Sequence, residues 1–192
     1  MARWQPDARE RLVAAALDLF NEHGYDQTTV AQIAERAGLT KSTFFRHFPD
    51  KRDVLAAGQD AIAQLLREGI AAAPPDATPL AAVCSGLKSA AVAFTSFNRE
   101  LAPKLRAAIA ASAELQERSA LKHIGLAAAM ADALQARGFV PPTATLAAEL
   151  GALAFKTAYT RWAEGDEDQD QDLGVIACEA LHDLHAAAAN LS

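Results

Sequence analysis

The segment that decides the fold has the form of two short helices with a very short connection between them. It covers residues 29–48 and reads Thr29-Val30-Ala31-Gln32-Ile33-Ala34-Glu35-Arg36-Ala37-Gly38-Leu39-Thr40-Lys41-Ser42-Thr43-Phe44-Phe45-Arg46-His47-Phe48. Thr29 and Gln32 have the spacing of a capping box, whose two side chains satisfy free N–H groups at the start of a helix. Apolar residues then follow at the spacing of one helical face, at Val30, Ile33, Ala34 and Ala37. The first of the two helices is therefore expected to end near Gly38.

The connection between the two helices is too short to let them run side by side. Only Gly38 and Leu39 separate the first helix from Thr40, whose hydroxyl can cap the second. Phe44 and Phe48 are four residues apart, so they can fasten the second helix onto the elements before it. The segment therefore predicts a helix-turn-helix.

Composition and periodicity extend the helical pattern along the chain. Alanine and leucine dominate the sequence, and alternating β-branched or aromatic runs are missing. We expect a helix over about 7–23 that ends at Gly24, and a fourth helix, capped by Asp50, that runs to about residue 72. Further helices are expected at about 80–98, 100–111, 114–137, 143–164 and 173–190. The predicted fold class is all-α.

A proline-rich stretch marks the expected domain border. Residues 74–79 contain three prolines, which cannot continue a helix. We expect a three-helix DNA-binding domain at residues 1–52, a connecting helix at about 50–72, and a C-terminal helical domain at 73–192 for ligand binding and dimerisation.

The start of the second short helix carries the chemistry expected of a DNA reader. An α-helix fits the major groove of B-DNA, where side chains of its first turn reach base edges. Thr40, Lys41, Ser42 and Thr43 are the candidates for base contacts. The candidates for phosphate contacts are Thr29, Arg46, His47 and Lys51. The alternative is that these residues merely solubilise an exposed helix.

The charge distribution is compatible with a nucleic-acid partner despite the net charge of −6. Residues 1–52 contain eight Lys and Arg against seven Asp and Glu, so the acidic excess lies in residues 53–192. Basic groups concentrate near residues 41–52, which predicts a footprint for DNA phosphates.

Residues 24–51 resemble the DNA-binding signature of the TetR family of transcriptional regulators. They add Gly24-Tyr25-Asp26-Gln27-Thr28 before the quoted segment and Pro49-Asp50-Lys51 after it, and the likeness extends over about residues 8–66. It implies a homodimer on a roughly palindromic operator, usually a repressor that a small-molecule ligand releases. Phe45 occupies a position where the family usually has a tyrosine that touches a phosphate, whereas His47 and Lys51 keep family phosphate positions.

The last two expected helices are the candidates for dimerisation. Apolar residues recur at helical spacing in both, as in Leu146, Leu150 and Leu153 of the first and Ile176, Ala180 and Leu184 of the second. We expect them to form a four-helix bundle with their symmetry mates, as the resemblance also implies. Packing of the same stripes within one subunit remains the alternative.

The residues of an effector site stay unassigned, although five large side chains could line a chamber: Phe94, Phe97, Phe155, Tyr159 and Trp162. An apolar or anionic ligand is expected there. No catalytic residue, metal or cofactor is predicted, because the sequence lacks a phosphate loop and a nucleophile elbow.

Three alternatives remain open. Cys178, His182 and His185 share a helical face and could hold a metal, although a pair of surface or interface histidines is the simpler interpretation. The acidic run at residues 166–172 alternates oxygen ligands but lacks the glycine and glutamate of a calcium loop. A helical interaction protein that does not bind DNA is the remaining class.

The predicted location is the cytoplasm, without membrane insertion. The N-terminus lacks the apolar core of a signal peptide, and no apolar run is long enough for a membrane span. Cys84 and Cys178 are far apart and fit no metal or redox spacing, so they are expected to be two reduced core residues.

Overall fold

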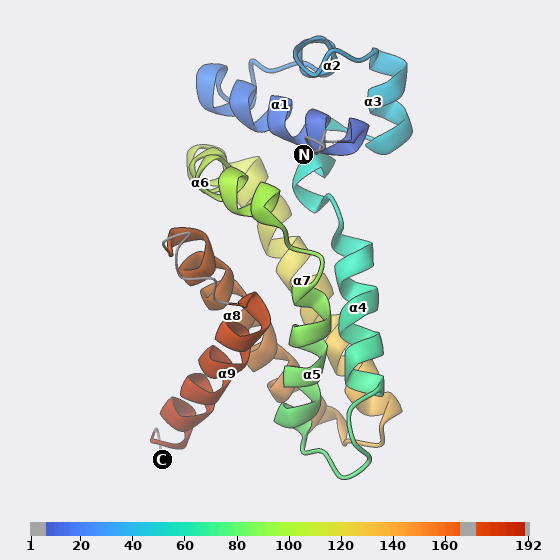
Figure 1. Cartoon of the computed structure of the whole chain (residues 1–192), viewed down its shortest axis with the longest axis vertical. Coiled ribbons are helices and arrows are strands. Elements are labelled where there is room, and N and C mark those ends of the chain that lie inside the picture. The colour runs from blue at the N-terminus through green and yellow to red at the C-terminus, as the bar shows by residue number, and fades with distance from the viewer. Residues whose placement is uncertain (1–6, 166–171, 191–192) are drawn as a thin grey trace, which may run out of the picture. The chain divides into compact units, whose positions relative to one another are not determined.

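The computed structural model describes residues 7–165 and 172–190, and these residues form helices without any strand. In chain order the elements are α1 (Ala8–His23), α2 (Val30–Arg36), α3 (Lys41–His47), the 3₁₀ helix η1 (Lys51–Ala56), α4 (Gln59–Ala71), α5 (Pro79–Ala91), α6 (Ser96–Ala111), α7 (Ala113–Ala136), α8 (Pro141–Glu164) and α9 (Leu173–Ala189) (Figure 1). The predicted all-α class is confirmed.

Packing divides the chain into two compact units. The first unit consists of Met1–Ala57 and Leu101–Leu121, and the second of Gly58–Glu100 and Lys122–Ser192. Residues 101–121 thus pack with the N-terminal helices, whereas the sequence-based border placed them in the C-terminal domain. A packing unit is not the same as an independently folding domain, so the borders predicted at residues 52 and 73 stay predictions.

The first unit is built on α1, whose start is fixed by its own side chains. The Asp7 carboxylate accepts a bond from the Glu10 N–H at 2.9 Å, and the Glu10 carboxylate accepts one from the Asp7 N–H at 3.1 Å. This reciprocal pair satisfies free N–H groups of the first turn. The buried side of α1 carries Leu12, Ala16, Leu19 and Phe20, which pack with the other helices of the unit.

The predicted fourth helix is two elements instead of one, so the expectation of a continuous helix from Asp50 was wrong. Asp50 does cap a helix, because its carboxylate accepts the Lys51 N–H, but that helix is the 3₁₀ element η1. It ends at Ala56, and Gly58 then adopts a φ of +80°, a left-handed conformation that glycine takes without steric cost. The connecting helix proper is α4.

The second unit is held by close contacts between helices through small residues. A side chain at Gly86 in α5 would place its Cβ 2.8 Å from the Cγ1 of Ile70 and 2.9 Å from the carbonyl oxygen of Leu66, both in α4. In the same unit, the Arg137 guanidinium donates to four carbonyls at the end of α4, those of Ile70, Ala71, Ala73 and Pro74. The last carbonyls of a helix lack their usual i+4 N–H partners, so Arg137 supplies donors where α4 ends.

One predicted helix break was misplaced. The expected helix over 80–98 ends at Ala91, and α6 begins at Ser96 rather than at residue 100. Thr95 and Asn98 mark the new start, because the Asn98 side-chain oxygen accepts the Thr95 N–H at 2.9 Å. Neither Arg99 nor Glu100 breaks helices, so the break follows the capping pair instead.

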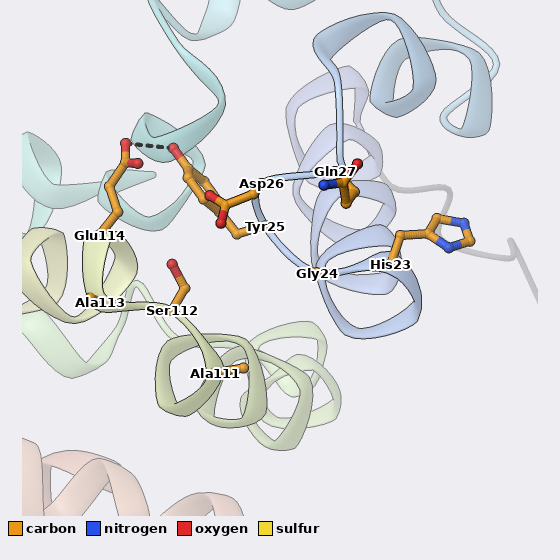
Figure 2. A pocket seen from close by; sticks show the side chains of 9 residues that line it. All are labelled: His23, Gly24, Tyr25, Asp26, Gln27, Ala111, Ser112, Ala113 and Glu114. Atoms are coloured by element: carbon orange, nitrogen blue, oxygen red, sulfur yellow. Dashed lines mark hydrogen bonds between the residues drawn. The ribbon is translucent and has the colours of Figure 1, made fainter.

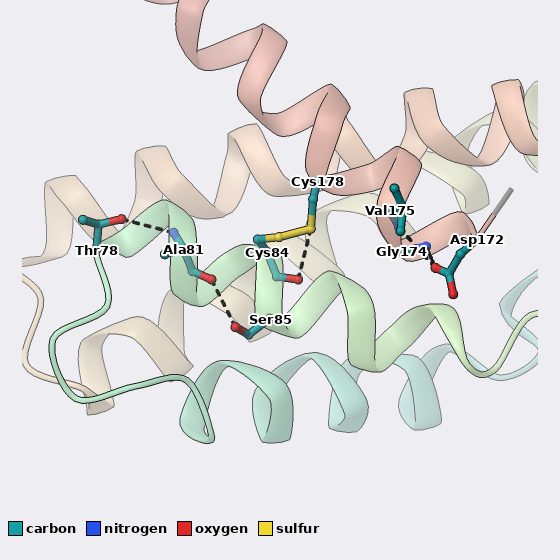
Figure 3. The surroundings of a disulfide bond; sticks show 8 residues. All are labelled: Thr78, Ala81, Cys84, Ser85, Asp172, Gly174, Val175 and Cys178. Carbon is teal, nitrogen blue, oxygen red and sulfur yellow. Dashed lines mark hydrogen bonds between the residues drawn. A yellow bond between two sulfur atoms is a disulfide. The ribbon is translucent and has the colours of Figure 1, made fainter.

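The two cysteines form a disulfide, which corrects the expectation of two reduced core residues. Cys84 in α5 and Cys178 in α9 have Cα atoms 5.2 Å apart, although 94 residues separate them in sequence (Figure 3). Their spacing in the sequence could not show this pairing, because it depends on how α9 packs on α5. The pairing also uses the one cysteine of the alternative metal site with His182 and His185.

Two further expectations, on membrane spans and on metal sites, are compared with the residues that the structure describes. Within residues 7–165 and 172–190, no single helix is long and apolar enough to cross a membrane; α5 and α6 reach that length and composition only when taken together, with a sharp bend between them. No group of three or more metal-ligand side chains is assembled in this part of the chain. Residues 166–171 of the acidic run lie outside it, while Asp172 caps α9.

Candidate nucleic-acid interface

Helix α2 begins with the capping box that the sequence predicts. The Thr29 hydroxyl accepts the Gln32 N–H at 3.3 Å, and the Gln32 side-chain oxygen accepts the Thr29 N–H at 2.8 Å. The Thr29 side chain is exposed, and its hydroxyl also lies 2.8 Å from the Gln32 oxygen. Ile33 and Ala34 form the buried side of α2.

The connection between α2 and α3 is fixed by backbone bonds and by one distant arginine. Gly38 has a φ of +65°, which lets the Leu39 N–H reach back to the carbonyl of Ala34 at 2.8 Å. Arg11 of α1 donates to the Ala37 carbonyl at the end of α2. A Cβ at Gly38 would lie 2.9 Å from this guanidinium, the end of a flexible side chain, so the left-handed φ is what favours glycine here.

Two phenylalanines anchor α3 in the core of the first unit. Phe44 is fully buried and Phe48 is 2% exposed, and their rings lie 5.5 Å apart. Arg9 of α1 lies over the Phe48 ring, with its guanidinium carbon 5.7 Å from the ring centre. The rotation of α3 about its own axis is therefore set by buried aromatic packing.

The opposite side of α3 is exposed and mixed in character. Its exposed residues are Lys41, Ser42, Phe45 and Arg46, at positions i, i+1, i+4 and i+5, which lie on one face of a helix. Phe45 is 52% exposed and meets the Phe44 ring edge-on at 5.6 Å. We call these four residues the outer face of α3.

The two threonines predicted to read bases are engaged in holding the start of α3. The Thr40 hydroxyl accepts the Thr43 N–H at 3.1 Å, and the two hydroxyl oxygens lie 2.9 Å apart. Thr43 is also half-buried. Of the four predicted base readers, Lys41 and Ser42 are therefore the ones whose side chains lie on the outer face.

Lys51, predicted to contact a phosphate, already has partners within the first unit. Its Nζ donates to the carbonyls of Tyr25 at 2.7 Å and Thr28 at 3.0 Å, and lies 4.1 Å from the centre of the Tyr25 ring. This geometry ties the start of η1 to the turn between α1 and α2. His47 is half-buried, and its Nε2 is a buried atom with no hydrogen-bond partner among the described residues.

Side chains that sequence reasoning missed tie residues 101–121 to the N-terminal helices. Lys104 donates to Asp18 at 2.6 Å, and Arg118 donates to Asp53 at 2.8 Å. The Tyr25 hydroxyl donates to Glu114 at 2.8 Å; burial, together with this bond to a carboxylate, raises the pKa of the tyrosine well above its usual value. These pairs are 65 to 89 residues apart, so no local pattern could have revealed them.

An open pocket of about 390 Å³ lies beside this contact (Figure 2). It is lined by the turn after α1, residues 23–27, and by residues 111–114 at the junction of α6 and α7. Figure 2 shows the Tyr25 hydroxyl directed at the Glu114 carboxylate. The pocket belongs to the first unit and does not include the outer face of α3.

A bidentate ion pair also links α1 to α2. Arg36 donates to both carboxylate oxygens of Glu22, at 2.9 and 2.7 Å. The hydrogen bond from Arg36 holds the pKa of Glu22 below its usual range, although both groups face solvent.

Four of the aromatic residues proposed for an effector chamber pack together in the second unit. The Phe94 ring lies 5.4 Å from Phe155, 5.6 Å from Tyr159 and 6.4 Å from Trp162. The Arg99 guanidinium sits 4.7 Å from the centre of the Trp162 ring. Burial raises the pKa of Tyr159 to about 12, and its hydroxyl donates to the Asn98 carbonyl at 3.3 Å. Phe97 is half-buried.

The segment that carries this candidate interface is similar to known regulatory proteins. Residues 12–57 match the model of the family described as bacterial regulatory proteins, tetR family. The chain is 36% identical over 81 residues to the HTH-type transcriptional regulator TcmR of Streptomyces glaucescens, covering 42% of this chain and 36% of that protein. It is 39% identical over 66 residues to the regulator BetI of Klebsiella pneumoniae, covering 34% of each. These matches span about a third of the length of the relatives.

Solved structures match over nearly the whole chain at low identity. A putative TetR-family regulator from Syntrophomonas wolfei has a TM-score of 0.58 at 19% identity, with 95% of each chain covered. A putative regulator from Pseudomonas aeruginosa has a TM-score of 0.56 at 19% identity, with 98% of this chain and 95% of that one covered. At this identity the likeness concerns the fold.

The matched relatives are named as regulators of transcription. The family model matches the α1 to η1 segment, which carries the outer face of α3. Residues 12–57 of the chain are thus similar to the tetR family of bacterial regulatory proteins.

Proposed function

We propose that the protein is a sequence-specific DNA-binding transcriptional regulator. The observation that carries the proposal is the outer face of α3, which presents Lys41, Ser42, Phe45 and Arg46 on a helix whose rotation is fixed by buried Phe44 and Phe48. A rigid helix with exposed basic and hydroxyl side chains fits the major groove.

The residues of the interface take different roles in this proposal. Lys41 and Ser42 contact base edges, and the Phe45 ring packs on a thymine methyl group or a sugar. Arg46, His47 and the exposed Thr29 hydroxyl contact phosphates. Thr40 and Thr43 hold the first turn of α3 in the shape the groove requires. Lys51 acts chiefly by fixing the turn between α1 and α2, because its Nζ is already bound there.

The protein acts as a homodimer through α8 and α9. Large apolar side chains on the outer sides of these helices support this: Leu146 is 63% exposed, Leu153 48% and Val175 49%. The inner side of α8 is mostly alanine and packs within the second unit. Two copies related by a two-fold axis would present two α3 helices to half-sites about 34 Å apart on a palindromic operator.

The regulator is a repressor that a small-molecule effector releases. A structural relative with a TM-score of 0.53 at 19% identity is FadR of Bacillus subtilis, described in complex with stearoyl-CoA. For this chain we propose a small ligand of unassigned chemistry in the second unit. A ligand that binds better to the state off DNA would lower operator occupancy. The DNA partner places the protein in the cytoplasm.

The test is selection of bound fragments from random DNA at two salt concentrations. The protein should enrich a palindromic site, and its affinity should fall steeply with salt because phosphate contacts release counterions. Lys41→Ala should weaken binding by about 1–3 kcal/mol, the range for a base-edge contact, and Arg46→Ala, which removes a phosphate contact, should weaken binding and reduce its salt dependence. Arg67→Ala is the matched control, since Arg67 is an exposed arginine of α4 outside the interface.

The outcomes are distinct. Enrichment that the two interface variants abolish and the control retains supports the proposal. Absence of any enriched site at either salt concentration contradicts it and favours the helical interaction protein instead.

A further inference from the structure

The disulfide between α5 and α9 joins a cysteine pair that the proposed interface does not use. Both cysteines are half-buried, so the bond lies at the margin of the core of the second unit rather than inside it (Figure 3). In compartments where DNA is transcribed, thiols are kept reduced, and disulfides there are usually transient and redox-sensing. A half-buried cysteine pair in a regulator that binds DNA is therefore expected to form its disulfide reversibly.

In the part of α9 around the disulfide, half of the buried residues have small side chains. Its buried residues are Leu173, Gly174, Ile176, Ala177, Ala180 and Leu181, of which three are glycine or alanine. From His185 to Asn190 every residue is exposed. Burial of small side chains contributes little, because hydrophobic stabilisation scales with apolar area. The covalent bond in the middle of this stretch adds to the packing of Leu173, Ile176 and Leu181 in holding α9.

The approach of α9 to α5 is already close before the bond is considered. A side chain at Gly174 would place its Cβ 3.0 Å from the Lys88 Cα and 3.3 Å from the Ala91 Cβ. The Asp172 carboxylate caps the start of α9 through the N–H groups of Gly174 at 2.6 Å and Val175 at 3.1 Å. These contacts keep the two sulfurs within reach of each other when the bond is open.

The reduced pair also has a partner for its proton. The Cys178 Sγ lies 3.5 Å from the carbonyl oxygen of Cys84, a contact that Figure 3 draws. In the disulfide the sulfur has no proton to donate, but the free Cys178 thiol can donate to this oxygen. Both redox forms are therefore compatible with the same local backbone.

We propose that Cys84 and Cys178 form a reversible thiol–disulfide switch that sets how firmly α9 is held on α5 and, through α9, the affinity for DNA. The last step rests on the proposed function, because α9 carries Val175 on the proposed dimer surface. Oxidation preorganises that surface, so the oxidised protein dimerises and binds its operator more tightly.

The chemistry is exchange with a low-molecular-weight disulfide such as glutathione disulfide. The thiolate of one cysteine attacks that disulfide, forms a mixed disulfide and releases one glutathione. The thiolate of the second cysteine then attacks the protein sulfur of the mixed disulfide, forms the Cys84–Cys178 bond and releases a second glutathione. Two protein thiols are oxidised, one glutathione disulfide is reduced, and the two thiol protons end on glutathione. Excess glutathione reverses both steps.

The experiment exposes the full-length protein to mixtures of glutathione and glutathione disulfide and quantifies the bond by mass spectrometry after thiol alkylation. We expect complete oxidation by the disulfide and complete reversal by excess glutathione, without unfolding. Amide exchange in residues 173–184 should slow on oxidation, and Tm should rise on the order of 10 °C. The Cys84→Ser, Cys178→Ser double variant is the control and should show neither change.

DNA binding is measured on the selected operator in both redox states. We expect about fivefold tighter binding of the oxidised protein, a coupling in the usual range, and no redox effect on the double variant. A bond that excess glutathione leaves intact, thiols that never pair, or equal operator affinity in both states would overturn the switch. If neither redox state binds any DNA, the proposed function is wrong. The reversible bond between α5 and α9 is then tested by the glutathione exchange measurement alone.

Discussion

The two units of the molecule are stabilised in contrasting ways. The first unit includes the two seven-residue helices α2 and α3, whose starts are capped by Thr29 and Thr40, around a core that contains aromatic rings at Phe20, Phe44 and Phe48. The second unit uses longer helices that approach closely through glycine and alanine, with one disulfide. Short helices gain little from their own hydrogen bonds, so they depend on caps and on a few large buried side chains. Long helices with small residues depend on close approach instead.

The largest effect should come from removing the aromatic anchor of the first unit. Phe44→Ala leaves a cavity at a fully buried position, and truncation of a buried phenylalanine costs about 3–5 kcal/mol. We expect loss of DNA binding and a lower midpoint in urea denaturation followed by circular dichroism. Phe45→Ala, one residue further on and 52% exposed, is the matched control for the stability measurement alone, because Phe45 belongs to the proposed DNA interface. Equal destabilisation by the two variants would show that α3 is not anchored as described.

The second unit should instead be sensitive to added volume. Gly86→Ala places a methyl group against Ile70 and the Leu66 backbone, and overpacking of this kind costs about 1–3 kcal/mol. Thermal unfolding measures the change. Gly125→Ala in α7 is the control: its Cβ would meet only the end of the flexible Gln59 side chain, so helix propensity should leave it neutral or stabilising. If Gly86→Ala unfolds at the same temperature as the unsubstituted protein, the second unit does not depend on close helix approach, and the contrast between the units is wrong.

A smaller effect is expected from a cap in the first unit. Thr40→Ala removes the hydroxyl that accepts the Thr43 N–H, which should cost about 1 kcal/mol of stability and weaken operator binding by disordering the first turn of α3. Thr40→Ser keeps the hydroxyl and should restore both properties. If Thr40→Ser loses DNA binding while it retains stability, the Thr40 methyl group contacts a base, and the threonine is a reader as well as a cap.

The smallest expected effect concerns Phe45. Phe45→Tyr adds a hydroxyl to an exposed ring, so stability should change by less than about 0.5 kcal/mol. Operator affinity should rise a few-fold, on the order of 1 kcal/mol, if the hydroxyl gains a phosphate as its partner. Titration of labelled operator at fixed salt measures this. Unchanged affinity would mean that the ring faces away from the backbone of the DNA.

The sequence alone determined the features that depend on local spacing. The capping box of Thr29 and Gln32, the cap at Thr40, the turn at Gly38 and the buried positions of Phe44 and Phe48 all follow from residues at most four apart. Such patterns are readable because helix ends and helix faces are set by neighbours in the chain. The likeness to the tetR family rests on the same segment.

Tertiary structure alone decided which side chains are available to contact a partner such as DNA. Lys51 has the residue type of a phosphate contact, yet its ammonium is bound to carbonyls more than 20 residues away. Cys84 and Cys178 meet only because α9 packs on α5, and Lys104, Glu114 and Arg118 find partners in the N-terminal helices. The physical reason is the same in each case: a hydrogen bond, an ion pair or a disulfide needs atoms a few ångströms apart, and chain spacing says nothing about that distance once it exceeds a helical turn or two.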